Sequence, residues 1–112
     1  MRVPKVFLPK VVEKFDVSAA RYKPAYDFSV AAQYGMLTEI LTKDDDVNFL
    51  SSHIPKIREA LADYQADDFF IAVGDPSLIA VCAGIILRKH PSMKMLKWDR
   101  KMHVYFIVEI KP

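Results

Sequence analysis

The sequence predicts a small α/β domain in which a mixed β-sheet packs against two helices. Residues 68–91 read as an apolar strand, a tight turn and an almost wholly apolar helix. A strand without polar alternation is typical of a sheet covered on both faces. After Pro91 the apolar period changes to two, which indicates a C-terminal hairpin. One domain is the natural interpretation of 112 residues, and the predicted order of its elements is β-β-α-β-α-β-β.

The N-terminal third is predicted to hold two strands separated by a loop. Residues 3–12 are rich in β-favouring side chains, but two prolines confine such a run to a sheet edge or an extended arm. Residues 13–27 show no clean period, so we predict a loop there. Residues 28–42 allow either a helix or a strand, and we favour a strand because Gly35 interrupts the helical pattern.

An aspartate-rich turn at residues 43–48 precedes the first predicted helix. Its alternate oxygen-bearing side chains imitate the opening of a calcium loop: Asp44, Asp46 and Asn48. The sixth position is Phe49 instead of Gly, and the twelfth is Pro55 instead of Glu. We therefore interpret the run as a solvated turn with helix-capping aspartates. Apolar residues at helical spacing then predict an amphipathic helix over residues 53–65, with Ser52 as its N-cap.

Residues 69–73 form the predicted central strand, and the three residues after it predict how the second helix begins. Gly74 permits a sharp turn, Asp75 is a good N-cap acceptor, and Pro76 suits the first helical position. A strand, a glycine turn and a helix N-terminus also make up phosphate sites. Here the glycine stands alone and the Asp75 carboxylate takes the place of a phosphate, so we predict a structural turn.

The second helix is predicted to run from Pro76 to about His90 as a helix of the core. Ala80 and Gly84 lie one turn apart, which predicts a close approach to another element. The apolar run is too short to span a bilayer. Cys82 is the one cysteine of the chain, and its apolar neighbours predict an inert buried thiol.

The C-terminal hairpin is predicted to pair residues 94–98 with residues 104–110 through a loop at residues 99–103. One face of the second strand is predicted to pack on the core through four alternate side chains: Val104, Phe106, Val108 and Ile110. The other face is mixed, so we expect it to contact a loop, the N-terminal arm or a partner.

Several short motifs in the second half of the chain carry a family resemblance. They are Val-Gly-Asp-Pro at residues 73–76, Leu-Lys-Trp-Asp-Arg at residues 96–100 and Tyr-Phe-Ile-Val-Glu-Ile at residues 105–110. With the aspartate-rich lead-in, this pattern resembles small uncharacterised proteins encoded by tailed bacteriophages, mainly over residues 66–110. The resemblance implies a small accessory protein that acts inside an infected bacterium, and it carries no activity and no catalytic residue.

Composition bears on partners and on the compartment. The hydrophobic share of 52% is high for a chain of this size, so we expect a homodimer or a tight protein partner to cover part of the apolar surface. A single cysteine allows no internal disulfide, which fits a reducing cytoplasm, here that of the host. The N-terminus lacks the apolar core of a signal peptide, and we expect no membrane association.

Charge is segregated along the chain, with net values of +3, −6 and +5 over residues 1–27, 28–87 and 88–112. The last segment holds a candidate patch for nucleic acid or a partner: Arg88, Lys89, Lys94, Lys97, Trp98, Arg100, Lys101 and Tyr105. Cations interleaved with aromatic rings are typical of single-stranded nucleic-acid binding. The alternatives are a solvated edge whose lysines deter aggregation, and charge pairing between subunits.

No catalytic constellation, metal-ligand spacing or cofactor motif is found in the sequence, so we expect neither an enzyme nor a bound metal or cofactor. The three histidines each have an ordinary interpretation as a cap, a dipole partner or a surface residue: His53, His90 and His103. An active site, if formed, would lie at residues 74–77, after the central strand. The sequence thus favours a binding module whose partner is protein, and single-stranded nucleic acid is the alternative.

Overall fold

The main sheet holds five strands in the order β4-β1-β5-β6-β7. In this computed structural model residues 2–11, 13–24 and 28–112 are described. The strands are β1 (Lys5–Lys10), β4 (Met36–Leu41), β5 (Phe69–Ile71), β6 (Met93–Asp99) and β7 (Val104–Ile110). The first four in the sheet order run parallel, and β7 pairs antiparallel with β6.

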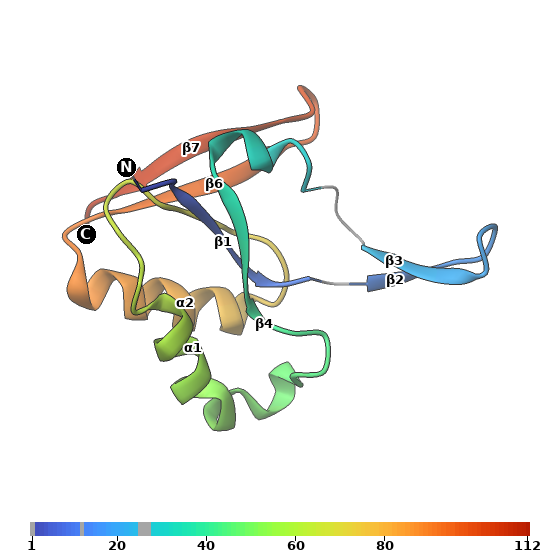
Figure 1. The fold of residues 1–112 in the computed structure, drawn as a ribbon, viewed down its shortest axis with the longest axis horizontal. Coiled ribbons are helices and arrows are strands. Elements are labelled where there is room, and N and C mark those ends of the chain that lie inside the picture. Colours follow the sequence, from blue (N-terminus) through green and yellow to red (C-terminus); the bar gives the residue numbers. More distant parts are fainter. Residues whose placement is uncertain (1, 12, 25–27) are drawn as a thin grey trace.

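Two helices connect the parallel strands, α1 (Ile54–Leu61) between β4 and β5 and α2 (Pro76–Lys89) between β5 and β6. The elements of the main sheet therefore follow the predicted order β-β-α-β-α-β-β, and the C-terminal hairpin is confirmed. Figure 1 shows both helices on the same side of the sheet. Two short 3-10 helices, η1 (Ala31–Tyr34) and η2 (Val47–His53), precede β4 and α1.

Each face of the sheet buries a separate apolar cluster. On the helix side, Phe7 and Phe70 of the sheet pack with Ile57, Cys82 and Ile86 of the helices. On the opposite side, strand residues pack under η1 and the segment before it in a second cluster: Val6, Leu8, Ile71, Leu96, Phe28 and Ala31. The alternation of neighbouring strand residues between the two clusters explains why the central strand β5 is apolar at every position.

The N-terminal strand is not at an edge, contrary to the prediction, because β1 lies between β4 and β5. The two prolines fit this position. Pro4 precedes the strand, and its carbonyl accepts from the Met36 N–H at 2.9 Å. In a strand with a parallel neighbour on each side, the backbone groups of successive residues point alternately to one neighbour and to the other. The Pro4 carbonyl points toward β4, so the Pro9 nitrogen, five residues later, points toward β5. The pairs between β1 and β5 are Val6–Phe69 and Phe7–Phe70, so Pro9 lies beyond the pairing and removes no ladder bond.

A hairpin replaces much of the predicted loop at residues 13–27. It consists of β2 (Glu13–Asp16) and β3 (Arg21–Pro24), paired antiparallel, and residues 25–27 of that predicted loop lie outside the described residues. The Asp16 carboxylate accepts from Ser18 N–H at 3.0 Å and closes the turn. Figure 1 shows the hairpin projecting away from the main sheet. Sequence periodicity missed it because strands this short carry little apolar alternation.

Residues 28–42 divide at Gly35 into η1 and β4, so the predicted strand is confirmed in its second half. The glycine is required by a close approach to the N-terminal strand. A Cβ added at Gly35 would lie 2.4 Å from the carbonyl oxygen of Pro4. Any side chain at this position would therefore push β1 and η1 apart.

The start of α2 follows the prediction, since Asp75 caps the helix by accepting from the Leu78 N–H at 3.0 Å and Pro76 opens it. The prediction for Gly84 was wrong: Gly84 is exposed, and an added Cβ would meet nothing within 4 Å. The first helix is shorter than predicted because it ends at Leu61, four residues before the expected end, whereas its start at Ile54 differs from the prediction by one residue. Ser52 is not its N-cap, because its hydroxyl donates to the Phe49 carbonyl instead.

Asp68 is a fully buried carboxylate that joins the N-terminus to the loop before β5. The Arg2 guanidinium donates to both of its oxygens, at 2.6 and 2.7 Å. The backbone N–H groups of Lys5 and Gln65 each donate at 2.8 Å. Burial alone would raise the pKa of Asp68, but these hydrogen bonds hold it below its usual value. Among the described residues, Asp68 is the one charged residue that is buried.

Candidate functional site

The eight residues of the predicted basic and aromatic patch do not form one surface. Arg88 and Lys89 lie in the last turn of α2, whereas Arg100 and Lys101 lie in the turn after β6. The seven residues of β6 separate these two groups, which corresponds to roughly 20 Å at about 3.3 Å per residue. The structure therefore divides the patch into a group at the end of α2 and a group at the hairpin.

The hairpin group is divided again between the two faces of the sheet. Lys97 is paired with Phe106, and its ammonium lies 5.8 Å from the centre of that ring. Trp98 is paired with Tyr105 on the other face, with ring centres 4.9 Å apart. Residues directly opposite in an antiparallel pair share a face, and the next pair along the strands lies on the other face. Lys97 and Trp98 therefore point away from each other.

The remaining aromatic and basic candidates have contacts within the domain. Tyr105 is buried, and its carbonyl oxygen accepts from the Tyr34 hydroxyl at 3.0 Å. The Lys94 ammonium lies 5.5 Å from the centre of the Phe69 ring. Trp98 is 36% exposed and also contacts His103 edge-on, with ring centres 6.0 Å apart. Of the predicted aromatic candidates, Trp98 alone is accessible to a ligand.

The fold pairs many of the acidic residues that gave the middle of the chain its negative charge. Lys5 forms an ion pair with Asp63, and the hydrogen bond from that ammonium lowers the pKa of Asp63. The Lys56 ammonium lies 2.6 Å from Asp45, and chiefly this hydrogen bond lowers the pKa of Asp45 to about 2. By contrast, within residues 2–11, 13–24 and 28–112 no carboxylate pairs with the predicted cations: Arg88, Lys89, Lys94, Lys97, Arg100 and Lys101.

The outer edge of β7 carries exposed apolar side chains. Strand β7 pairs with β6 along its whole length, and no other described strand covers its second side. Val104, Phe106 and Ile107 are 42%, 43% and 49% exposed, and Met102 in the preceding turn is 69% exposed. Glu109 is the one charged residue of the strand. We call Met102, Val104, Phe106, Ile107 and the adjacent Trp98 the β7 edge surface.

The exposure of Val104 and Phe106 differs from the prediction that this face of β7 packs on the core. Ile110, at the far end of the same face, does contact the helix-side cluster. The helices lie near the start of β6, opposite Ile110, so they do not cover the half of β7 next to the hairpin turn. The buried residue of β7 is Tyr105, which lies on the other face. Alternation in the sequence could show neither this nor where the helices end.

A basic hollow lies between the ends of the two helices. Arg58 from the last turn of α1 lines it together with Ile85, Arg88 and Lys89 from the last turns of α2. Its volume is about 390 Å³. The three cations are exposed, and within the described residues none of them pairs with a carboxylate. The charge pattern of the sequence did not single out Arg58, because this residue lies in the acidic middle segment.

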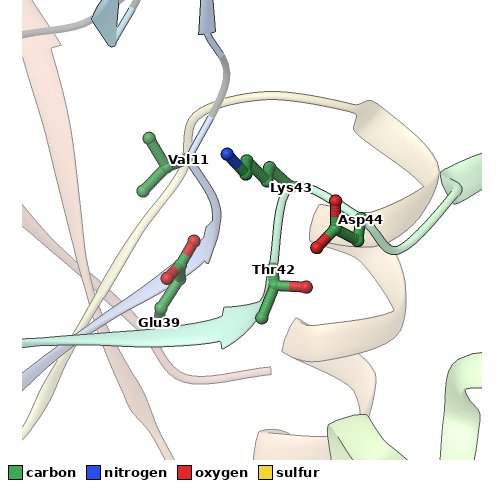
Figure 2. Close-up of a pocket in the computed structure, with 5 residues that line it drawn as sticks. All are labelled: Val11, Glu39, Thr42, Lys43 and Asp44. Atoms are coloured by element: carbon green, nitrogen blue, oxygen red, sulfur yellow. The ribbon is translucent and has the colours of Figure 1, made fainter.

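A second hollow lies beyond the carboxyl ends of β1 and β4, where the two strands leave toward opposite faces of the sheet. Open α/β sheets commonly bind ligands in this position. It has a volume of about 350 Å³ and is lined by Val11, Glu39, Thr42, Lys43 and Asp44. Figure 2 shows Glu39 pointing toward Val11 and the end of Lys43. The mixed charges and exposed side chains of this hollow select no ligand class.

Asp75 and Cys82, for which the sequence predicted a helix cap and an inert buried thiol, have these structural roles. The Asp75 carboxylate is occupied by the Ser77 hydroxyl and the Leu78 N–H. Cys82 is fully buried, and burial raises the pKa of its thiol to about 12. Among the described residues, no three side chains of His, Cys, Asp or Glu gather as metal ligands would. None of the described helices combines the length and apolar character that crossing a membrane requires.

Comparison with known proteins identifies a family to which the chain is similar. A family model described as phage Pam3 gp32-like protein matches residues 4–112, which is nearly the whole chain. No curated protein and no solved structure gives a significant match.

Proposed function

Since the chain belongs to the family of phage Pam3 gp32-like proteins, we propose that it is a non-enzymatic accessory protein that works by binding protein, beginning with a second copy of itself. The observation that carries the proposal is the β7 edge surface. Natural proteins usually blunt an exposed sheet edge with charges, prolines, bulges or a covering element. Seven residues of β7 hold one charge and no proline, and their outer side is free of any other described strand.

A second copy fits this edge because strand β7 can pair with its counterpart about a two-fold axis. Antiparallel pairing across such an axis brings the same face of each sheet together. With the axis at Phe106, this ring would face its counterpart and Val104 would face Val108 of the other copy. The two five-stranded sheets would then form one continuous sheet. Apolar cross-strand pairs on both faces add to the backbone hydrogen bonds of the new ladder.

The size of the surface predicts how strong this association is. Large side chains bury roughly 150–250 Å² each, so the exposed parts of the β7 edge surface amount to roughly 500 Å² per copy. A standard stable interface buries about 800 Å² per partner. The association is therefore expected to be weak and dependent on concentration, which suits an edge that a phage or host protein also uses.

The proposed dimer is tested by sedimentation velocity over a wide range of protein concentrations. Phe106→Lys places a charge at the centre of β7 and is expected to leave a monomer at every concentration. Met36→Lys is the matched control, because Met36 is a comparably exposed apolar residue on β4, the opposite edge of the sheet. A wild-type chain that stays monomeric, or a Met36→Lys variant that loses the dimer equally, would contradict the proposal.

Single-stranded nucleic acid remains the alternative ligand, through Trp98 and the cations of the hairpin. The structure separates Lys97 from Trp98, so a nucleic-acid strand would have to use Arg100 and Lys101 beside Trp98. Titration with a short oligonucleotide, followed by Trp98 fluorescence at several salt concentrations, distinguishes the two ideas. Quenching that weakens steeply with salt and is lost in Arg100→Glu would favour nucleic acid over the protein partner.

A further inference from the structure

We propose that the hollow between α1 and α2 is a binding site for a phosphate monoester, in which Arg58, Arg88 and Lys89 hold the phosphate group. This site is separate from the β7 edge surface and does not rest on the proposed self-association. Its three cations come from two helices that are distant in sequence, and the fold brings them to one hollow of about 390 Å³.

The charge at the hollow exceeds what the helix ends require. Cations in the last turn of a helix are ordinarily explained by the partial negative charge of its free carbonyl groups. That charge is about −0.5 per helix, so the two helices together offset at most about one positive charge of the three. A surplus of roughly two positive charges remains. Among the described residues no carboxylate lines the hollow, so its three cations share it without a counter-charge from those residues.

The surplus and the side-chain types select the ligand class. A phosphate monoester carries about −1.5 to −2 charges at neutral pH, which matches the surplus better than the single charge of a carboxylate. Guanidinium groups offer paired N–H donors that suit phosphate oxygens, and the Lys89 ammonium adds a mobile point charge. Two arginines on different helices can hold the phosphate from two sides.

The volume of the hollow and its apolar wall indicate that the phosphate belongs to an organic molecule. Small-molecule sites are usually about 300–1,000 Å³ and are lined partly by apolar side chains. The hollow reaches the lower part of this range, and Ile85 supplies an apolar contact beside the cations. A free phosphate ion would leave this part of the hollow unused.

The test is a titration of the ¹⁵N-labelled full chain with phenyl phosphate at constant ionic strength, observed by amide chemical shifts. We expect saturable shifts in the last turns of α1 and α2. In the double variant Arg58→Gln/Arg88→Gln the dissociation constant should rise by at least about ten-fold, because each charge-assisted hydrogen bond contributes that much or more. Both residues are exposed, so the variant is expected to keep the fold and the wild-type amide spectrum elsewhere.

The matched control is Lys97→Gln/Arg100→Gln, which removes the same number of charges from the hairpin. It should leave the dissociation constant for phenyl phosphate within about two-fold of the wild-type value, because separated surface charges are screened by salt. Equal weakening in both double variants would show a general charge effect and overturn the site. Absence of saturation, or shifts that map to the hairpin, would also overturn it. Binding of an oligonucleotide but not of phenyl phosphate at Arg58 and Arg88 would replace the monoester with a nucleic-acid backbone.

Discussion

Replacement of Asp68 by asparagine tests the buried ion pair that fastens the N-terminus to the core. The substitution keeps the shape of the side chain but leaves one acceptor oxygen where the carboxylate has two. Each carboxylate oxygen accepts one bond from Arg2 and one from a backbone N–H, that of Lys5 or that of Gln65. Whichever way the amide is turned, its NH₂ group faces two of these donors.

The expected loss of stability follows from those contacts. Two hydrogen bonds to a charged acceptor are lost, at about 1.5–3 kcal/mol each, and removal of one partner of a buried ion pair costs about 3–5 kcal/mol in total. The Arg2 side chain is 34% exposed and can recover some hydration. We therefore expect Asp68→Asn to lower the free energy of unfolding by about 3 kcal/mol, toward the lower end of that range.

The assay is urea unfolding followed by far-ultraviolet circular dichroism, with Asp67→Asn as the matched control. Asp67 is 59% exposed and lies 3.5 Å from the same guanidinium. Such an exposed pair contributes less than about 1 kcal/mol. A small loss in Asp68→Asn, or equal losses in the two variants, would refute the assignment of stability to the buried contact.

The same pair of proteins gives a dependence on pH. The pKa of Asp68 is lower in the folded chain than in the unfolded chain, so its contribution is fully present above its unfolded pKa of about 4. It is lost as the pH falls through the folded value. The stability difference between the wild type and Asp68→Asn should therefore shrink below about pH 4. A difference that stays constant in acid would show that shape, and not charge, is responsible.

The two best-defined glycines and the cysteine give further predictions. Gly84→Ala should stabilise the chain by about 1 kcal/mol in thermal unfolding, because the position is exposed, helical and sterically open. Gly35→Ala should destabilise it, because the new Cβ would lie 2.4 Å from the Pro4 carbonyl oxygen; the same sign at both positions would refute this explanation. Cys82 should not react with a thiol reagent in native buffer and should react fully in denaturant, and fast native reaction would contradict its burial.

Local signals in the sequence predicted the centre of the fold. The apolar run at β5, the cap at Asp75 and the proline that opens α2 depend on neighbouring residues, so the sequence contains the information needed to place them. The order of the main-sheet elements followed from the alternation of helical and strand periods. The resemblance to small proteins of tailed phages came from short motifs in the same half of the chain, and the family match over residues 4–112 agrees with it.

Long-range pairing decided what the sequence alone did not determine. Pro4 and Pro9 suggested that the N-terminal strand lies at an edge of the sheet. The position of β1 depends, however, on which strands pair on either side of it, and its pairing with β5 ends before Pro9. The exposure of Phe106 depends on how far the helices extend across the sheet.

The candidate sites show the same division between local and tertiary information. Arg88 and Arg100, both in the basic C-terminal segment, are separated by the length of β6, and the neighbours Lys97 and Trp98 lie on opposite faces of the sheet. Arg58, thirty residues before Arg88, is brought to the same hollow by the contact between α1 and α2. The sequence by itself thus determined the order of the main-sheet elements, the apolar central strand and the family. The tertiary structure decided which charges share a surface, because that depends on contacts between residues far apart in the chain.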